Sequence, residues 1–339
     1  MMGPLFEKIV VVTQKTALEE LVERYNTRDQ ARFYLEHMGI SFAEYQAAHD
    51  QYHSSLTLLK SYLPPKMRTQ MIERSFLPNF LFDPRDLVVT LGRDGLVINT
   101  AKYLDGQPLV AFNPDPERID GVLIPFPIET AAEVLHRVLD FAHRVRRVTM
   151  AKATLNDGQK LYAVNDLYIG HRTQLSAYYR LRLGERQENH CSCGIIVSTG
   201  AGSTGWLRAV LAGAAGVLEA LLPALSIQAE SASYVSRRVQ VEEPVAPTSL
   251  VEQVRNSYAF DATAERLVFS VREPFVSRVS AAEITYGEIG PGQTLEIISR
   301  MPQNGVIFSD GVESDFLHFD SGAIASVAIA EKKVSLVCP

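Results

Sequence analysis

The sequence of 339 residues predicts two domains: an α/β domain over residues 1–148, followed by a mostly antiparallel β domain over residues 149–339. In the first half, short apolar runs rich in β-branched residues alternate with amphipathic helical patterns, which indicates a parallel sheet covered by helices. In the second half, short strand-like runs are separated by turn sequences, and residues 175–183 alternate, as in antiparallel sheets. The length also favours two domains, because single cores seldom grow beyond roughly 250 to 300 residues.

In the first domain, residues 8–13 and 87–91 are apolar runs without alternation, as expected of strands buried on both faces, and residues 109–113 form a third. Apolar residues at three- and four-residue spacing predict helices between these strands. Gly39 is a plausible stop for the second helix, and Pro64 with Pro65 ends the third. These helices are expected over residues 17–25, 28–37, 41–63, from residue 96 onward and over residues 130–147.

The helix over residues 41–63 carries His49 and His53 one turn apart, with His37 in the preceding helix. Two histidines on one face resemble half of a zinc site, but there is no Glu arranged as in His-Glu-x-x-His and no third ligand nearby. The sequence therefore predicts surface or packing histidines and no metal site.

In the second domain, residues 156–158 (Asn-Asp-Gly) separate two strand patterns and predict a hairpin. After a glycine-rich loop, residues 206–222 predict one long inserted helix, and the chain beyond Pro223 is polar until residue 267. The strands of this domain are expected over residues 148–155, 160–164, 175–183, 194–198, 267–272, 283–286, 294–299, 306–309, 323–330 and 334–337, with a turn at residues 309–311.

Composition narrows the class of protein. Hydrophobic residues make up 46% and charged residues 21% of the chain, and the formal net charge is −6. A general nucleic-acid binder needs an excess of Lys and Arg for phosphate contacts, so a nucleic-acid partner is not expected. Cys191, Cys193 and Cys338 cannot form a disulfide framework, and Cys-x-Cys without a His/Cys cluster is a poor zinc signal.

The N-terminal residues 1–7 have neither the basic and apolar regions of a signal peptide nor an Arg-rich transit segment. No run approaches the roughly 18 apolar residues of a membrane span. We therefore expect a cytoplasmic protein without a membrane partner.

The strand over residues 87–91 ends at the turn Gly92-Arg93-Asp94-Gly95, and a helical pattern begins at once. Open α/β sheets bind ligands at such strand ends, where glycines and a helix N-terminus suit phosphates. A carboxylate in this position makes chemical sense if it takes a proton from an attacking hydroxyl or helps to hold Mg²⁺. The alternative is a strand-to-helix turn with a capping Asp.

The next strand end leads into a loop dense in turn formers, residues 113–121, which begins with Asn113 and Asp115. A polar loop at this position either grips ribose hydroxyls or turns the chain.

A second glycine-rich loop, residues 198–206, joins a strand to the inserted helix. Glycines and hydroxyls together can surround phosphates with donors. The loop matches the dinucleotide fingerprint Gly-x-Gly-x-x-Gly, but no strand ending in Asp or Glu follows about 20 residues on, so a dehydrogenase is the least favoured function. A P-loop sequence is absent. The residues of interest are Thr199, Gly202, Ser203, Thr204, Gly205 and Trp206.

Together these motifs resemble those of the NAD kinases. The turn at residues 92–95 is similar to the family's Gly-Gly-Asp-Gly, Asn165-Asp166 to its Asn-Glu pair, and residues 199–206 to its Thr-x-x-Gly-Ser-Thr-Ala-Tyr loop. The mitochondrial-type branch looks closest, through residues 113–118, 269–274 and 320–326. The resemblance runs from about residue 9 to residue 337. It implies the two-domain NAD kinase-like fold and a homodimer whose site lies between the domains.

The resemblance also implies roles for individual residues. Asp94 would be the general base that takes the proton from the 2′-hydroxyl of the adenine ribose of NAD. Gly92 and Gly95 would let the phosphates of ATP approach, and Mg²⁺ would arrive with that nucleotide. Asn165 and Asp166 would hold ribose hydroxyls of NAD. Thr204, Gly205 and Trp206 would line the NAD pocket, where the Trp206 ring could stack on a base or simply pack.

Two residues depart from the family pattern. Arg93 replaces a glycine, which would cost roughly 1 kcal/mol or more if the turn needs positive φ, although its guanidinium could instead pair with a phosphate. Asp166 replaces a glutamate and is one methylene shorter. Arg272 could reach a ligand phosphate, with a structural salt bridge as the alternative.

The sequence thus predicts an NAD kinase that uses ATP and Mg²⁺. The alternatives are a protein of the same fold that has lost catalysis and senses NAD or NADPH, and a kinase for another hydroxyl acceptor. The sensor draws its support from Arg93.

Overall fold

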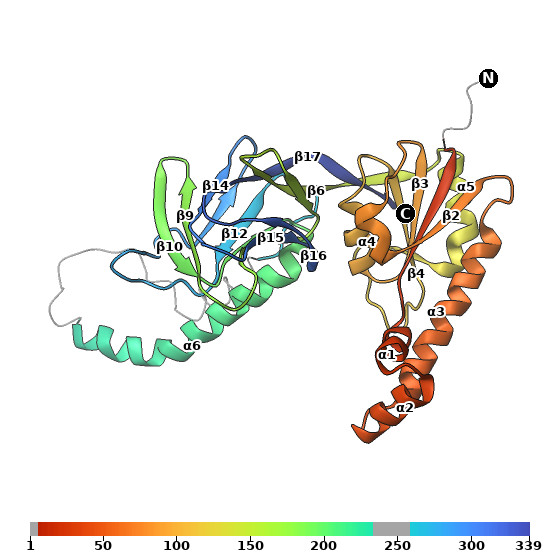
Figure 1. Cartoon of the computed structure of the whole chain (residues 1–339), viewed down its shortest axis with the longest axis horizontal. Helices are drawn as coiled ribbons and strands as arrows, with labels where there is room; N and C mark the ends of the chain where they lie inside the picture. The colour runs from red at the N-terminus through yellow and green to blue at the C-terminus, as the bar shows by residue number, and fades with distance from the viewer. Residues whose placement is uncertain (1–5, 233–257) are drawn as a thin grey trace. The chain divides into compact units, whose positions relative to one another are not determined.

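The computed structural model describes residues 6–232 and 258–339 (Figure 1). The chain forms two compact units, one of Met1–Val148 with Glu331–Pro339 and one of Thr149–Ala330. The sequence placed residues 331–339 in the second domain, and this was wrong. They belong to the first unit because they complete its parallel sheet. Residues 1–5, on which much of the argument for a cytoplasmic protein rests, lie outside the described part of the chain.

The first unit is built on a parallel sheet with the strand order β2, β1, β3, β4. The end of β17 pairs with β4 and extends this sheet by one strand. Every residue of β3 is buried, as the unbroken apolar run predicts. The strands are β1 (Lys8–Thr13), β2 (Arg68–Glu73), β3 (Asp86–Leu91), β4 (Pro108–Asn113), the short β5 (Phe126–Pro127) and β17 (Ile324–Cys338).

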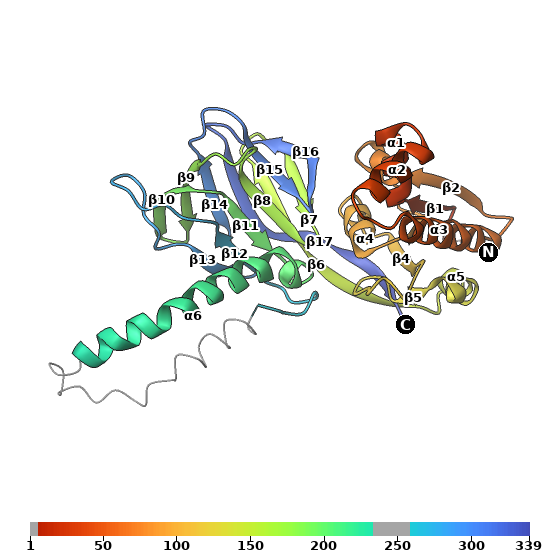
Figure 2. The ribbon, with the colours of Figure 1, turned by 90° about the horizontal axis from the view of Figure 1, so that it is seen from below.

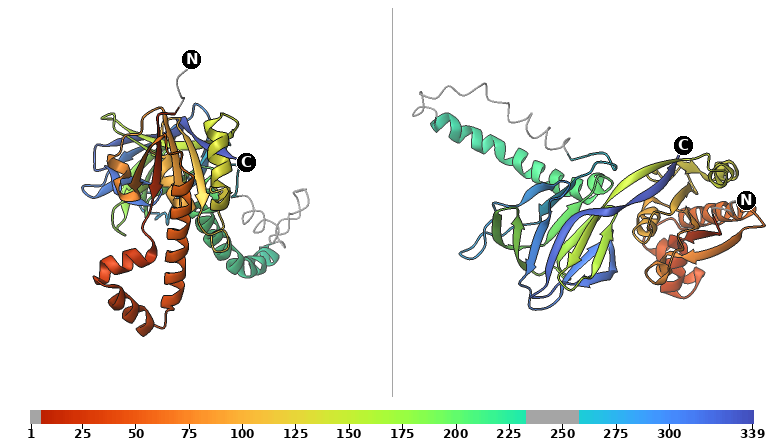
Figure 3. Two further views of the ribbon diagram at one scale, coloured as in Figure 1. Left: turned by 90° about the vertical axis from the view of Figure 1, so that its right-hand side faces the viewer. Right: turned by 90° about the horizontal axis from the view of Figure 1, so that it is seen from above.

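Helices cover this sheet on both faces. Buried residues of α3 and α5 pack with Ile9, Val11 and Val89, which point to one face. Figure 1 shows α4 on the opposite face. Near the start of α3, the helices α1 and α2 pack against it and against each other (Figure 3). The helices are α1 (Ala17–Tyr25), α2 (Arg28–His37), α3 (Phe42–Tyr62), α4 (Asp94–Ala101) and α5 (Ala131–Leu139), with short 3-10 turns η1 (Arg74–Asn79) and η2 (Ile128–Thr130).

The helix predicted over residues 130–147 ends at Leu139 instead. Phe141 has a φ of 61°, which a right-handed helix cannot continue through, and strand β6 begins at Arg144. The arginines that suggested a helix end lie in this strand, where Arg147 donates a hydrogen bond from Nη1 to Ser335 Oγ (2.6 Å). Pairing with β17 overrides the local helical preference.

The second unit is a sandwich of two sheets around one hydrophobic core, which confirms the mostly antiparallel β prediction. One sheet has the order β13, β12, β11, β8, β15, β16. The other contains β10, β9, β14 and the first part of β17. Strand β6 also pairs with β17, and β7 pairs with β6. The strands are β6 (Arg144–Leu155), β7 (Lys160–Ala163), β8 (Asp166–His171), β9 (Ala177–Leu183), β10 (Arg186–Ser192), β11 (Ile195–Ser198), β12 (Leu267–Val271), β13 (Tyr286–Ile289), β14 (Leu295–Ser299), β15 (Gly305–Ser309) and β16 (Val312–His318).

Five strands, β2, β5, β8, β10 and β16, were not predicted from the sequence. The strand expected at residues 283–286 begins at Tyr286, and the two tail strands are one continuous strand, β17. Strands β2, β10 and β16 are rich in polar residues, and only their pairing with β1, β9 and β15 makes them strands. Strand β8 is buried along its whole length, but the sequence indicated only the Asn165-Asp166 motif there.

Helix α6 (Trp206–Ala232) starts beside β11 and extends away from the sheets of its unit (Figure 2). It is longer than predicted and continues past Pro223. The polar stretch expected after this proline lies partly outside the described residues. The segment Gly202–Leu221, which begins just before α6, has a mean hydropathy of 1.2 and could cross a membrane by length and composition alone.

Candidate functional site

The turn at residues 92–95 lies between β3 and α4, at the carboxyl end of a parallel strand as predicted. The Gly92 N–H donates to the carbonyl oxygen of Phe112 (3.2 Å), which ties the turn to the end of β4. Arg93 precedes the helix with φ −89° and ψ 169°, an extended conformation that any residue adopts. The strain that a side chain would cause at positive φ is therefore absent.

The carboxylate of Asp94 does not cap its own helix. Its Oδ2 accepts a hydrogen bond from the N–H of Val122 (3.1 Å), and its Oδ1 accepts one from the N–H of Leu123 (2.9 Å). These two bonds fix the orientation of the half-buried carboxylate. Each oxygen retains a further lone pair with which it can accept a proton or another hydrogen bond.

Asn113 and Asp115 shape the loop that reaches Asp94. Asn113 donates from Nδ2 to the Ile119 carbonyl oxygen (2.9 Å) and accepts at Oδ1 from the Asp115 N–H (2.9 Å). The carboxylate of Asp115 accepts from Arg118 Nη1 (2.8 Å). Both side chains are buried and form hydrogen bonds within the loop, which turns the chain. That they also bind ribose hydroxyls stays a prediction.

In the second unit, Asn165 and Asp166 stand at the start of β8 and are held by Asp310. The carboxylate of Asp310 accepts the backbone N–H groups of Val164 (3.0 Å), Asn165 (2.7 Å) and Asp166 (3.2 Å). Asp310 has a φ of 55° in the turn between β15 and β16. Sequence reasoning predicted only a turn there, because Asp-Gly is so common in hairpins that it gives no sign of this role.

Two buried oxygen atoms in this pair have no hydrogen-bond partner among the described residues: Oδ1 of Asn165 and Oδ1 of Asp166. Burial raises the pKa of Asp166 to about 7; a hydrogen bond from Ser198 lowers it, and the charge of Asp310 raises it further. An unsatisfied buried acceptor costs about 1–3 kcal/mol, which a ligand that donates hydrogen bonds would recover. The arrangement therefore suits hydroxyl groups of a ligand.

The glycine loop packs directly against this pair. The Thr199 N–H donates to the Asn165 carbonyl oxygen (2.9 Å). A Cβ atom on Gly202 would lie 2.4 Å from that same oxygen, and one on Gly200 would lie 2.1 Å from the carbonyl oxygen of Asp261. Both glycines thus permit an approach of backbone to backbone that no other residue allows.

The rest of the loop is partly structural and partly exposed. Ser203 is buried; its hydroxyl donates to the Gly200 carbonyl oxygen (2.7 Å) and accepts from the Phe260 N–H (3.3 Å). Thr204 and Gly205, by contrast, are exposed at the start of α6. The structure therefore leaves these two residues, rather than Ser203, available to a ligand.

Trp206 opens α6 and is half-buried. Its ring stacks on Tyr168 with centroids 5.8 Å apart and planes within 11° of parallel. The guanidinium carbon of Arg272 lies 5.4 Å from the Trp206 ring centroid, which is the geometry of a cation–π contact. Tyr168 was missed by sequence reasoning, because a strand residue carries no mark of the ring it will stack on.

The predicted site residues therefore gather in two groups, each within one unit. The first group is the turn of Gly92, Arg93, Asp94 and Gly95 together with the loop that begins at Asn113. The second group consists of Asn165, Asp166, Thr199, Gly202, Ser203, Thr204, Gly205 and Trp206, which Asp310 supports.

No protein-family model matches this sequence, and a search among curated proteins finds no significant match. Solved structures are similar in fold. The yeast NADH kinase complexed with NADH aligns over 99% of this chain and 84% of its own, with a TM-score of 0.55 and 14% identity. An NAD kinase from Archaeoglobus fulgidus in complex with ATP aligns over 98% of this chain and 93% of its own, with a TM-score of 0.51 and 14% identity. The predicted fold class is thereby confirmed.

Proposed function

We propose that this protein is a kinase that transfers the γ-phosphoryl group of ATP to the 2′-hydroxyl of the adenine ribose of NAD, giving NADP and ADP. The observation that carries the proposal is the pair of buried, unpartnered oxygens on Asn165 and Asp166, which suits ribose hydroxyls. The likeness in fold to kinases solved with NADH and with ATP supports both substrates. The closer likeness to the mitochondrial-type branch stays a prediction.

Asp94 is the general base in this proposal. Its carboxylate takes the proton of the 2′-hydroxyl while that oxygen forms a bond to the γ-phosphorus, and the bond from the γ-phosphorus to the bridging oxygen of ADP breaks. The hydrogen bonds from Val122 and Leu123 hold the carboxylate in one orientation, which a general base needs.

The ATP phosphates bind at the N-terminus of α4. Gly95 is exposed, and nothing lies within 4 Å of where its Cβ would be, so its backbone is open to phosphate oxygens. The exposed guanidinium of Arg93 supplies a positive charge for the same phosphates. Mg²⁺ bound together with ATP would supply positive charge that neutralises the phosphates during the transfer.

On the NAD side, Asn165 and Asp166 bind ribose hydroxyls. Thr204, Gly205 and Trp206 line the surface for the rest of the dinucleotide. Thr199 and Gly202 support this site from behind, because Thr199 donates its N–H to the Asn165 carbonyl oxygen and Gly202 lets the loop pack against that oxygen. Ser203 stabilises the loop itself through its hydrogen bond to the Gly200 carbonyl oxygen.

The test is NADP formation from NAD, ATP and Mg²⁺, read through an NADP-specific dehydrogenase, in the wild type and in Asp94→Asn. We expect the variant to lower kcat by about 10²- to 10⁴-fold, since that is the usual contribution of a general base, with NAD affinity unchanged. Asp120→Asn, at an exposed carboxylate of the loop that begins at Asn113, is the matched control and should keep wild-type activity.

Two results would overturn the proposal or part of it. If the wild type binds NAD but makes no NADP with ATP, the protein is a sensor of the dinucleotide. If Asp94→Asn keeps the wild-type rate, the base is another group. The family resemblance further suggests a homodimer, and light scattering on the purified protein would measure its mass. The cytoplasmic location, expected from residues 1–7 and from the lack of a long apolar run, stays a prediction.

A further inference from the structure

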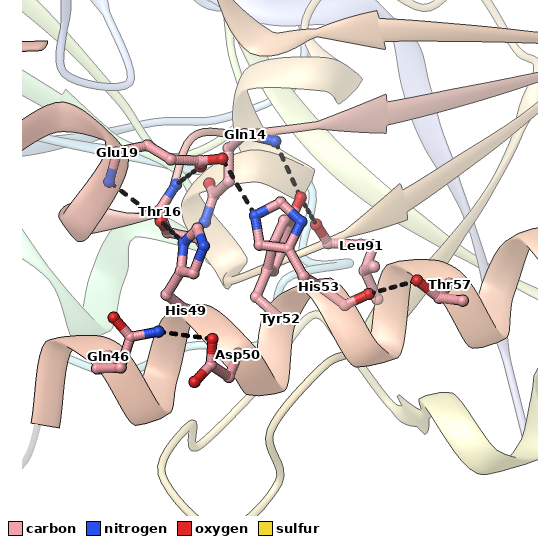
Figure 4. A network of polar contacts seen from close by, with 10 residues as sticks. All are labelled: Gln14, Thr16, Glu19, Gln46, His49, Asp50, Tyr52, His53, Thr57 and Leu91. Carbon is pink, nitrogen blue, oxygen red and sulfur yellow. Dashed lines mark hydrogen bonds and ion pairs between the residues drawn. The ribbon is translucent and has the colours of Figure 1, made fainter. Parts of the chain in front are cut away.

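A cluster of three metal-ligating side chains lies in the first unit, where α1 packs on α3 (Figure 4). His49 and His53 are one turn apart on α3, and their ring centroids are 4.3 Å apart. Glu19, in the first turn of α1, lies beside them. One ligand atom from each of the three residues lies within 4.8 Å of the other two. The third ligand that the sequence lacked near the histidines is thus supplied by tertiary packing.

The donor spacing is close to that around a metal ion. Nε2 of His53 and Oε1 of Glu19 are 3.1 Å apart. In a tetrahedral zinc site with bonds of about 2.0–2.1 Å, two ligand atoms stand about 3.3 Å apart. A metal ion therefore replaces the proton shared by these two atoms with little movement. The side chains of His53 and Glu19 are 43% and 36% exposed, so they can turn to close the wider gap to His49.

Thr16 orients two of the three ligands. Its Oγ1 lies 2.8 Å from Nδ1 of His49 and accepts the Glu19 N–H at 3.3 Å, while its own N–H donates to Glu19 Oε2 (2.7 Å). A hydrogen on His49 Nδ1, donated to this hydroxyl, leaves the Nε2 lone pair for a metal. Metal-binding histidines commonly hold their second ring nitrogen in this way.

We infer that Glu19, His49 and His53 form a binding site for a divalent transition-metal ion, with Zn²⁺ as the preferred ion and water in the remaining position. Two imidazoles and one carboxylate are typical ligands of Zn²⁺, whereas Mg²⁺ and Ca²⁺ prefer oxygen ligands alone. The bound ion cross-links α1 and α3. This site is separate from the Mg²⁺ that accompanies ATP and does not depend on the proposed kinase activity.

One residue of α3 connects the helix that carries His49 and His53 to the end of β3. The hydroxyl of Tyr52, next to His53 in sequence, accepts from the Gln14 N–H (3.2 Å) and donates to the Leu91 carbonyl oxygen (3.4 Å). Leu91 is the last residue of β3 before the turn. The segments that carry the metal ligands are thus the ones that position the end of β3.

The test is titration of the untagged, metal-free full chain with Co²⁺, which reports four-coordinate binding through its visible absorption, followed by displacement with Zn²⁺. We expect one ion per chain and a higher Tm in the presence of Zn²⁺. His49→Gln and His53→Gln should each weaken binding about 100-fold or more, since even loss of an outer partner costs roughly 10- to 100-fold.

His136→Gln is the matched control. His136 of α5 lies four residues before Asp140, with its Nδ1 3.0 Å from Asp140 Oδ2. Among the described residues no third ligand joins this His–carboxylate pair. Its replacement should leave binding unchanged. A second control is the double variant Cys191→Ser with Cys193→Ser, which should keep the Co²⁺ spectrum.

The inference fails if the wild type shows no visible Co²⁺ band and no change of Tm with Zn²⁺. It also fails if the band survives in both histidine variants, or disappears only in the cysteine variant, which would place the metal at the thiols. Tm values of the metal-free variants near that of the wild type will show that loss of binding is not loss of folding.

Discussion

Asp166 shows how burial changes the chemistry of a single side chain. Its carboxyl is buried against Asp310, and its pKa rises from 3.8 to about 7. Between these pH values the folded protein holds a proton that the unfolded chain has released. The free energy of unfolding therefore falls as pH rises from about 4 to about 7, and the loss is complete above that. A shift of about three pKa units corresponds to roughly 4 kcal/mol as an upper figure.

The variant Asp166→Asn should remove this pH dependence, because an amide has the shape of the protonated acid and no charge. We expect the variant to be more stable than the wild type at pH 8, and the difference to shrink towards zero near pH 4. Urea unfolding of both proteins at several pH values would measure it. An equal difference at pH 5 and pH 8 would contradict the assigned protonation.

At the scale of the element, the glycine loop at residues 198–206 shows why Gly200 and Gly202 cannot be replaced by larger residues. The loop packs so closely against the start of β8 that a Cβ atom on Gly202 would lie 2.4 Å from the Asn165 carbonyl oxygen. The loop also carries the strand-to-helix turn into α6. Its glycines therefore set the distance between two backbones, which in turn positions Asn165 and Asp166.

Gly202→Ala should destabilise the second unit by about 1–3 kcal/mol, the usual cost of forcing extra atoms into a packed site, and should weaken NAD binding. Gly213→Ala is the contrasting control. Gly213 is exposed inside α6, with nothing within 4 Å of its Cβ position, so alanine there should stabilise the helix by about 0.5–1 kcal/mol. Denaturant unfolding followed by circular dichroism would measure both. Equal and small effects would show that the loop can relax around a methyl group.

At the scale of the whole molecule, residues 331–339 belong to the same compact unit as residues 1–148. After the second unit, β17 pairs with β4, and its residue Val337 is fully buried in the core of the first unit. Lys332, in the same strand, donates from Nζ to the carbonyl oxygens of Lys102 (3.1 Å) and Leu104 (2.8 Å). The first unit therefore cannot complete its sheet until the last residues of the chain are present.

Val337→Ala should lower the free energy of unfolding of the first unit by about 2 kcal/mol through the cavity it leaves. The control Val122→Ala, at a side chain 73% exposed, should change it by less than about 0.5 kcal/mol. Thermal unfolding of both variants would compare them. An effect confined to the second unit would contradict the assignment of residues 331–339.

The sequence by itself determined the features that depend on neighbours along the chain. Buried strands such as β1 and β3 were predicted from their unbroken apolar runs, and α1 and α2 from their helical spacing and Gly39, which has a φ of 73°. The turn with Asp94 and the glycine loop were found because their glycines and hydroxyls lie close together in sequence.

Only the tertiary structure decided the features that depend on distant partners. Strand β10 is polar and exists through its pairing with β9, and the predicted helix over residues 130–147 was cut short by pairing of β6 with β17. Asp310 reaches the Asn165 backbone from 145 positions away, and Glu19 joins His49 through the packing of two helices. Such contacts leave no local pattern, because the energy that selects them comes from burial and hydrogen bonds formed only when the whole chain has folded.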